Sequence, residues 1–258
     1  MAIIKKISSR VSKFGIIGTV RLIVGKSLTG WRRDMILKLD EPEDRFTKIY
    51  NSNHWNSLES RSGEGSTFEN TQNIRERLPD LLKKYQINTL LDIPCGDFNW
   101  MRFVVESLSL KYIGGDIVKD LINKNNQFYS DTNIKFIHLD LTKGPLPTAD
   151  LMLCRDCLFH LSYEDIKNTL EVFLSSSIDY LLTTSNAALD GPRLTNYNIV
   201  TGDMRNLDFF APPFDLSSSD VIEVFEDSMV SSSAKRWMIL LKKPAVQKML
   251  EALKNNQF

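Results

Sequence analysis

The sequence contains little cysteine, few histidines and no net charge. Among its 258 residues are three cysteines and three histidines. An odd number of cysteines without the spacing of a disulfide framework favours a reducing compartment, so we expect a cytoplasmic protein. The 32 basic and 32 acidic residues cancel. No global field therefore attracts nucleic acid, and we expect no nucleic-acid partner.

Long apolar runs are also absent. The longest candidate begins at Phe14 and is interrupted by Arg21, which is well short of the ~20 residues that span a bilayer. A secretory signal would need a small-residue cleavage site after that stretch, and no convincing one follows.

The charge is distributed unevenly. Residues 1–38 hold nine basic residues and one acid, Asp34, which leaves 23 basic and 31 acidic residues elsewhere, a net charge of −8. A basic leader on an acidic body predicts peripheral contact with an anionic membrane surface. Packing of the leader on the domain, or a solvated basic face, is the alternative. Apolar residues recur in it at helical spacing, as expected of an interfacial helix: Ile3, Ile4, Ile7, Val11 and Phe14.

The chain divides into three parts. Residues 1–45 are a basic leader with helical periodicity, residues 46–70 are polar and irregular, and residues 71–258 form a globular domain. The domain contains a long polar loop, 186–219. This length suits one α/β domain with additional segments.

Helix and strand patterns alternate through the domain. Helical spacing of apolar residues predicts a helix over 71–85 and further helices from 99, over 119–128, from 162 and at the C-terminal end. Two apolar runs, 221–225 and 236–241, follow without a full helix between them and predict an antiparallel hairpin. We therefore expect an α/β, Rossmann-like doubly wound sheet, mostly parallel, with this hairpin at its edge. Short apolar runs predict the parallel strands at 89–93, 111–116, 134–139, 150–154 and 180–184.

Polar residues follow the predicted strands at the edge where ligands bind in such sheets. Asp92 and Gly96 end the first strand, and glycine lets the backbone approach a ligand closely. Asp116 ends the second strand, 24 residues after Asp92, a separation typical of an acid that binds ribose hydroxyls. Asp140 and Leu141 follow the third strand, where an acid and an apolar residue suit an adenine.

The segment Leu91-Asp-Ile-Pro-Cys-Gly-Asp97 resembles the first motif of class I S-adenosylmethionine (SAM)-dependent methyltransferases, acid-x-Gly-x-Gly, with Pro94 in place of the first glycine. The resemblance covers about residues 71–243 and implies a seven-stranded sheet of order 3-2-1-4-5-7-6 with SAM as cofactor. Pro94 and the terminal hairpin disfavour an NAD-dependent dehydrogenase.

This resemblance implies roles for the residues at the strand ends. Asp116 would bind the ribose, Asp140 would accept the adenine amino group, and the backbone near Gly96 would approach the methionine part. Ile117 and Leu141 would flank the adenine. The implied cofactor residues of the sheet are Asp92, Gly96, Asp116, Ile117, Asp140 and Leu141.

The segment from His54 to Thr67 resembles the corresponding segment of bacterial enzymes that methylate surface-polysaccharide sugars. It implies that residues 46–70 close over the cofactor. Arg61, Ser66 and Thr67 would bind its carboxylate, a bidentate task that suits arginine. An ordinary loop is the alternative for the two glycines of this segment.

Candidate catalytic residues follow the fourth strand. A sugar hydroxyl is a very weak acid, so methylation of its oxygen calls for a general base. Histidine accepts protons near neutrality. We expect His160 to be the base with Asp156 as its orienting partner, or the reverse.

The loop 186–219 carries aromatic and charged residues that suit an acceptor-binding flap. We expect Tyr197 to contact the acceptor, and Arg193 and Arg205 to meet a phosphate of a nucleotide-linked sugar. A solvated loop is the alternative.

A metal site is not expected. Cys154, Cys157, Cys95 and His160 would supply four zinc ligands. Structural zinc sites, however, use two close pairs of ligands, and the sequence has one.

The predicted function is a SAM-dependent O-methyltransferase for a sugar hydroxyl, for example of a nucleotide-linked heptose, in capsule or lipopolysaccharide biosynthesis. A small-molecule or protein N-methyltransferase remains an alternative, as does a non-catalytic interaction protein that retains the fold. A nucleic-acid methyltransferase is disfavoured by the acidic body. No feature of the sequence sets the oligomeric state.

Overall fold

A computed structural model describes residues 30–230 and 235–256 of the chain. By its internal contacts the chain forms two units, residues 1–40 and 41–258. In the first unit, residues 30–37 are helical. Most of the predicted membrane-binding leader lies outside the described residues. Within 30–230 and 235–256, no helix is both long and apolar enough to cross a bilayer.

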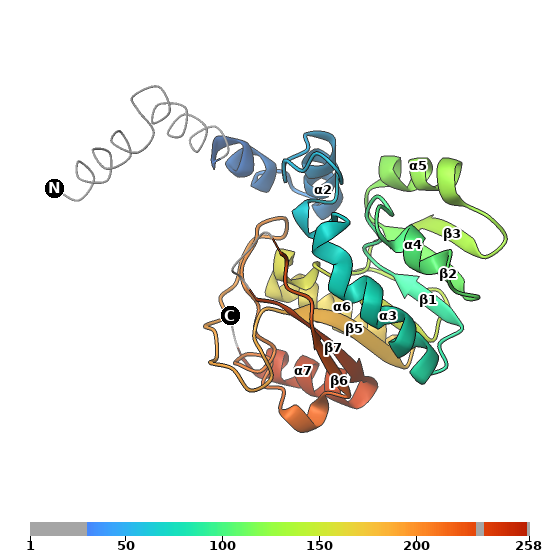
Figure 1. Cartoon of the computed structure of the whole chain (residues 1–258). Coiled ribbons are helices and arrows are strands. Elements are labelled where there is room, and N and C mark those ends of the chain that lie inside the picture. Colours follow the sequence, from blue (N-terminus) through green and yellow to red (C-terminus); the bar gives the residue numbers. More distant parts are fainter. Residues whose placement is uncertain (1–29, 231–234, 257–258) are drawn as a thin grey trace, which may run out of the picture. The chain divides into compact units, whose positions relative to one another are not determined.

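The second unit is built on one seven-stranded sheet of order β3-β2-β1-β4-β5-β7-β6 (Figure 1). This is the predicted order. Neighbouring strands from β3 to β5 pair in parallel, whereas β7 is antiparallel to both β5 and β6. The predicted hairpin is thus confirmed. The strands are β1 (Thr89–Asp92), β2 (Lys111–Asp116), β3 (Ile134–His138), β4 (Leu151–Cys154), β5 (Tyr180–Ser185), β6 (Glu223–Glu226) and β7 (Trp237–Lys242).

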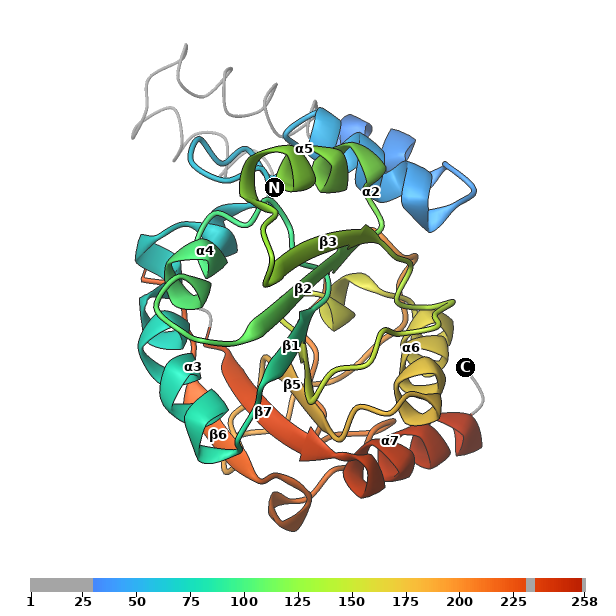
Figure 2. The same ribbon diagram turned by 90° about the vertical axis from the view of Figure 1, so that its right-hand side faces the viewer.

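Helices cover both faces of the sheet, and Figure 2 shows α3 and α4 on one side with α6 and α7 on the other. Successive side chains of a strand point to opposite faces. Accordingly, Leu90 packs with the residues of α3, α4 and α5, while Leu91 packs with those of α6 and α7. The helices are α2 (Pro42–Asn51), α3 (Gln72–Lys84), α4 (Met101–Val105), α5 (Lys119–Tyr129), α6 (Tyr163–Ser175) and α7 (Lys243–Asn255).

Local sequence explains where these helices begin. Ser162 caps α6 by accepting a hydrogen bond from the Asp165 backbone N–H at 3.1 Å, which satisfies one of the free donors of the first turn. In α3 the buried residues Ile74, Leu78 and Leu81 recur at intervals of four and three, as one face of a helix requires. Both helices lie close to the predicted ranges.

Residues 46–70, which we predict to close over the cofactor and call the lid segment, are mostly irregular. The lid segment contains most of α2, the 3₁₀ turn Glu64–Ser66 and the start of a second, Glu69–Thr71. The helix α2 spans residue 45, where the sequence suggested the leader would end.

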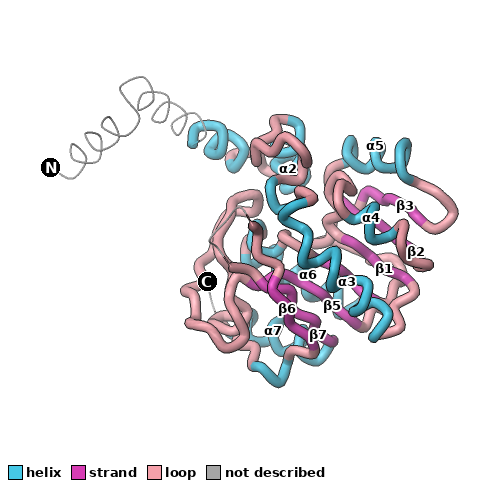
Figure 3. The backbone as a smooth tube through the Cα atoms, viewed as in Figure 1, coloured by secondary structure: helices cyan, strands magenta, loops and turns pink. Residues whose placement is uncertain are grey.

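The long loop between β5 and β6 has no regular element before the 3₁₀ turn Ser218–Asp220, and Figure 3 shows it as loop. It is nevertheless packed. Leu207, Phe209 and Phe214 are fully buried and belong to the core on the α6–α7 face. The loop is therefore part of the folded domain, and it is not the solvated loop that the sequence left open as an alternative.

Candidate active site

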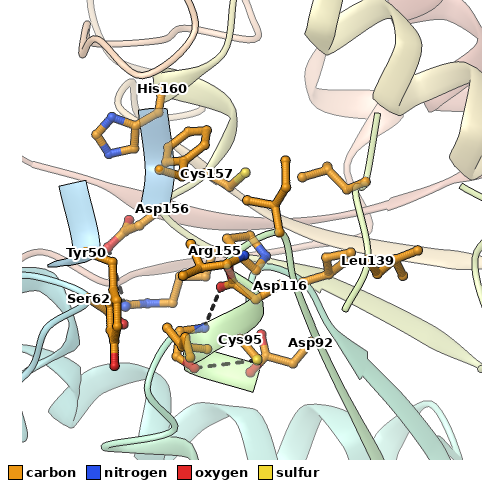
Figure 4. Close-up of a pocket in the computed structure, with 18 of the residues that line it drawn as sticks. Tyr50, Ser62, Asp92, Cys95, Asp116, Leu139, Arg155, Asp156, Cys157 and His160 are labelled. Atoms are coloured by element: carbon orange, nitrogen blue, oxygen red, sulfur yellow. Dashed lines mark hydrogen bonds and ion pairs between the residues drawn. The ribbon is translucent and has the colours of Figure 1, made fainter. Parts of the chain in front are cut away.

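A cavity lies at the carboxyl ends of the parallel strands. The strands contribute Asp92 and Asp116 to its lining, the loop after β3 contributes Leu141, and the lid segment contributes Trp55 and Ser62. Asp156 and His160, which follow β4, also line it. Figure 4 shows His160 at the end of the cavity opposite Asp92 and Cys95. The cavity thus brings together most of the predicted cofactor residues and both catalytic candidates.

The carboxylate of Asp92 is buried below the cavity. It accepts a hydrogen bond from the Tyr112 hydroxyl at 2.8 Å. Burial raises the pKa of Asp92 to about 7, against the lowering effects of the Tyr112 hydrogen bond and the positive charge of Arg155. An acid of this kind readily holds a proton near neutral pH.

Asp116 shapes the loop that follows β1. Its Oδ2 accepts from the Gly96 N–H at 3.2 Å, and its Oδ1 accepts from the Val118 N–H at 2.9 Å. Burial raises its pKa to about 6, although these backbone hydrogen bonds oppose the rise. Asn125 donates to the Gly96 carbonyl at 2.8 Å, so both backbone polar groups of Gly96 have partners.

Glycine is required at position 96 for two reasons. Its φ is +56°, in the left-handed region. A Cβ there would also collide with the Ser62 hydroxyl of the lid segment. The lid therefore lies directly on the loop after β1.

Asp97 fastens the lid to this loop. Its carboxylate accepts hydrogen bonds from the Ser60 hydroxyl at 2.9 Å, the Arg61 N–H at 2.7 Å and the Ser62 hydroxyl at 3.2 Å. The Ser62 hydroxyl in turn accepts from the Asp97 N–H at 2.9 Å. These bonds hold the lid against the loop without engaging the guanidinium of Arg61, which lines the cavity.

Four charged side chains form a largely buried network at the wall of the cavity, to which Arg155 and Asp156 contribute. The Nε of Arg155 pairs with Asp227 Oδ2 at 2.8 Å, and its Nη1 lies 3.4 Å from Asp156 Oδ2. Arg236 pairs with the same two carboxylates. The side chains of Arg155, Arg236 and Asp227 are at most 6% exposed. Each charge is therefore compensated inside the protein, as burial demands.

The lid also contacts this network. Arg155 Nη1 donates to the Gly65 carbonyl at 2.9 Å, and Arg236 Nη2 donates to the Asn70 carbonyl at 3.3 Å. A Cβ on Gly65 would lie 2.7 Å from Asp156 Oδ2 and 2.9 Å from Arg236 Nη1. Glycine at position 65 thus permits close approach of the lid to the ion pairs.

His160 has a defined tautomer. Its Nδ1 lies 2.8 Å from the Asp203 carbonyl oxygen, and a carbonyl only accepts, so Nδ1 carries the proton and Nε2 a lone pair. Its ring also contacts Trp55, with ring centroids 5.7 Å apart. Burial lowers the pKa of His160, which favours the neutral form.

The orienting partner of His160 is therefore not Asp156, as the sequence suggested, but the backbone of Asp203. Asp156 is engaged by Arg155 and Arg236, and by Thr184 Oγ1 at 3.3 Å. Both oxygens of Asp156 thus have partners, whereas Nε2 of His160 carries a lone pair.

The predicted adenine-binding residues lie together at the ends of β2 and β3. Ile117, Asp140 and Leu141 all line the cavity, and Leu139 joins them. One oxygen of Asp140, Oδ1, accepts from the Thr142 N–H at 2.9 Å and from its hydroxyl at 2.7 Å.

Of the predicted carboxylate-binding residues, Arg61 and Ser66 line the cavity and Thr67 does not. The Thr67 hydroxyl instead donates to the Glu64 carbonyl at 3.0 Å and accepts from the Asn70 N–H at 3.3 Å. Its hydroxyl therefore holds the turn of the lid.

The predicted acceptor residues of the long loop do not line the cavity. Arg193 donates to loop carbonyls and lies 3.4 Å from Asp208 Oδ1. Tyr197 is exposed, and Arg205 is 2% exposed and donates to the Leu161 carbonyl. In this structure neither arginine is available for a phosphate in the cavity, because neighbouring backbone groups occupy Arg193 and burial encloses Arg205.

Several lining residues escaped sequence analysis. Trp55, Tyr50 and Trp100 carry no pattern that distinguishes them from core aromatics, and Arg155 reads as a residue between two cysteines. Ser62 could have been found from the sequence, since it lies in a Ser-rich segment just before a glycine. The three cysteines are all free and buried. Within residues 30–230 and 235–256, no group of three or more histidine, cysteine or acidic side chains is arranged to hold a metal ion.

No protein-family model matches the chain, and no curated protein matches it in sequence. Solved structures share its fold. A SAM-dependent methyltransferase of Leishmania major superposes with a TM-score of 0.57 at 13% identity, over 83% of this chain and 91% of that one. Human N-acetylserotonin methyltransferase in complex with SAM gives 0.47 at 19% identity, over 77% of this chain and 58% of the human one. PigF with SAH gives 0.49 at 14% identity, over 81% and 61%.

The similarity to the Leishmania structure, together with the strand order and the antiparallel hairpin, establishes that this chain has the class I methyltransferase fold. The chain spans only about three fifths of the length of the human enzyme and of PigF.

Proposed function

We propose that the protein is a SAM-dependent O-methyltransferase in which His160 is the general base. One observation gives this proposal its main support. The Nδ1 of His160 is held by a backbone carbonyl at 2.8 Å, which leaves Nε2 as a proton acceptor in a residue that lines the same cavity as Asp116.

The residues present fit SAM. Asp116 is a buried carboxylate at the end of β2 and suits two ribose hydroxyls. Ile117 and Leu141 supply apolar walls for an adenine. Oδ2 of Asp140, which lies 3.2 Å from the exposed Lys143 Nζ, has a further lone pair for the adenine amino group. Arg61 lines the cavity from the lid and suits a carboxylate. Bound SAM supplies an activated methyl group on a sulfonium.

The protein's own part in the reaction is alignment and proton transfer. The lid, fastened through Asp97, limits the access of water to the cavity. His160 accepts the proton of the acceptor hydroxyl at Nε2, and its positive charge is then stabilised by the Asp203 carbonyl and the nearby Asp156 carboxylate. Such proton transfer typically contributes about 10²–10⁴-fold to rate.

For the acceptor we propose a sugar hydroxyl, in a cytoplasmic step of surface-polysaccharide synthesis. Support comes from the resemblance of the segment His54–Thr67 and from Trp55. The Trp55 ring lies beside His160 and offers a flat apolar surface for one face of a sugar ring. Since Arg193 and Arg205 are otherwise engaged, the sugar need not carry a nucleotide.

The first test is calorimetric titration of the full chain with S-adenosylhomocysteine. We expect micromolar binding in the native protein, at least tenfold weaker binding in Asp116→Ala, and no change in Asp120→Ala. Asp120 is an exposed acid of α5 four residues further along and serves as the matched control. Absence of binding to the native chain would refute the proposal and favour a non-catalytic protein with this fold.

The second test is methyl transfer from SAM to a panel of free sugars, nucleotide-linked sugars and amines. Transfer to a sugar hydroxyl that is lost in His160→Gln supports the proposal. Transfer to an amine that survives His160→Gln would indicate an N-methyltransferase, because an amine needs no strong base.

A further inference from the structure

We propose that the loop segment Gly202–Arg205 is a positioning device for His160: the Asp203 carbonyl selects the tautomer with a free Nε2, and the buried positive charge of Arg205 keeps the ring neutral. This inference rests on the proposed role of His160 as base. It concerns a segment 42–45 residues further along the chain, to which the fold by itself assigns no function.

The segment encloses the turn that carries His160. The Gly202 N–H donates to the His160 carbonyl at 2.8 Å, and the Arg205 N–H donates to the Phe159 carbonyl at 3.2 Å. Between them, the Asp203 carbonyl accepts from His160 Nδ1 at 2.8 Å. Three successive contacts along four residues thus fix both the backbone and the ring of this histidine.

Neighbouring loop residues strengthen this attachment. Thr201 Oγ1 accepts from the Ser162 N–H at 2.8 Å, and Asn198 Oδ1 accepts from the Tyr163 N–H at 2.8 Å. Both donors belong to the start of α6, directly after His160. The loop therefore binds the turn and the helix as one rigid body, which is the condition for a precisely aimed catalytic group.

Arg205 is unusual in its burial. It is 2% exposed, and among the described residues it forms no ion pair with a carboxylate. Its Nη1 donates to the Leu161 carbonyl at 2.7 Å, and its guanidinium lies 5.0 Å from the Tyr163 ring centre. Nε and Nη2 have no hydrogen-bond partner in the described part of the chain. Burying a cation without an acid is costly, and such groups call for an explanation other than stability.

The explanation we infer is electrostatic. Charges from three groups act on His160: Asp156 and Asp203 favour the protonated ring, and Arg205 opposes it. Removing the positive charge of Arg205 should therefore raise the pKa of His160 and favour a proton on Nε2, the atom whose lone pair a base needs. Arg205 adds to burial, which is the largest cause of the lowered pKa of His160.

The test is nuclear magnetic resonance of the full chain labelled with ¹⁵N-histidine, without cofactor or acceptor. The chain has only three histidines, and His160→Gln assigns the relevant signals. We expect the Nδ1–H tautomer at pH 8 and a titration midpoint below the ordinary value of about 6.5.

Variants separate charge from structure. In Arg205→Met we expect the His160 midpoint to rise above the native value, whereas Arg205→Lys, which keeps the charge, should stay near the native value. Arg193→Met is the matched control. It removes another arginine of the same loop, whose guanidinium is engaged by a loop carbonyl and by Asp208, and should leave the midpoint unchanged.

An Nε2–H tautomer in the native chain, or a midpoint at or above the ordinary value, would overturn the proposal even if Arg205→Met failed to fold. An unchanged midpoint in folded Arg205→Met would also overturn it. Because the measurement needs neither SAM nor an acceptor, a protein that fails to methylate but shows these spectra would refute the proposed function and leave the positioning of His160 intact.

Discussion

Arg155 and Asp227 form an ion pair of 2.8 Å, from Nε to Oδ2, although 72 positions separate them in the chain. Arg155 directly follows β4 and Asp227 directly follows β6. Their side chains are 4% and 0% exposed. The pair therefore connects the cavity-lining edge of the sheet with the terminal hairpin, and Arg155 extends the connection to the lid segment at Gly65.

Replacing Asp227 should destabilise the whole domain. In Asp227→Asn two buried arginines lose a carboxylate, which typically costs about 3–5 kcal/mol of unfolding free energy. Glu226→Gln is the matched control, because its exposed pair with Lys235 is worth at most about 1 kcal/mol. Urea unfolding of both variants measures the difference, and equal losses would contradict a structural role for the buried network.

A methyl group at Gly65 should displace the lid. The added Cβ would lie within 3 Å of Asp156 Oδ2 and Arg236 Nη1, and these atoms are held in a buried ion pair. We expect Gly65→Ala to bind S-adenosylhomocysteine about tenfold more weakly, or roughly 1.4 kcal/mol. Gly30→Ala, whose Cβ meets nothing within 4 Å, should bind normally. Native affinity in Gly65→Ala would show that the lid does not contribute to the site.

Cofactor affinity should depend on pH through Asp116. Burial raises the pKa of Asp116 to about 6, so below that pH the carboxyl is protonated in the free protein. The proton must leave before both oxygens can accept hydrogen bonds from ribose hydroxyls. The affinity for S-adenosylhomocysteine should therefore be constant near pH 8 and fall about tenfold by pH 5. Asp116→Asn should bind more weakly at pH 8 and show a flatter profile. A flat native profile would count against Asp116 as the ribose ligand.

Neutralising Asp92 should stabilise the protein at high pH. Because burial raises the pKa of Asp92 to about 7, the native state binds its proton more tightly than the unfolded state does. Ionisation consequently lowers stability, increasingly from about pH 4 to 7 and fully above that range.

Asp92→Asn keeps an acceptor for the Tyr112 hydroxyl and removes this cost. We expect a gain of about 1–3 kcal/mol at pH 8 and little gain at pH 4.5, measured by thermal unfolding. The same gain at both pH values would mean that the charge of Asp92 is not its cause.

Loss of the imidazole should affect turnover and not cofactor binding. For His160→Gln we expect kcat to fall about 10²–10⁴-fold, with the affinity for S-adenosylhomocysteine within about twofold of the native value. Retained kcat would exclude His160 as the base. A parallel loss of cofactor affinity would instead indicate a collapsed cavity.

The sheet and its ligand-binding edge could be predicted because both are local in sequence. Strand β1 and Gly96 lie within one short segment, and alternating apolar runs report which residues are buried. The position of Asp116 then follows from the geometry of parallel strands. Even the strand order was accessible through the resemblance carried by residues 91–97.

Contacts between segments that are distant in the sequence could not be predicted from local patterns. Arg205 is polar and lies in a loop, yet its guanidinium meets the Leu161 carbonyl 44 positions away and is buried. The burial of Arg205 and its contact with Leu161 depend on how the loop folds, since no periodicity in the sequence connects the two positions. The same holds for Asp203, whose backbone takes the place that the sequence suggested for Asp156 as partner of His160.

The order of the strands has a consequence for synthesis of the protein. Strand β7 follows the other six strands in the chain but lies between β5 and β6 in the sheet, so its fully buried residues Met238–Leu241 leave the ribosome after every other strand. Until then the nascent chain exposes β5 as an open edge, the kind of surface to which foreign strands add. Arg236 directly precedes β7, so the lid segment can form its hydrogen bond from this arginine to the Asn70 carbonyl only after the other six strands have been synthesised.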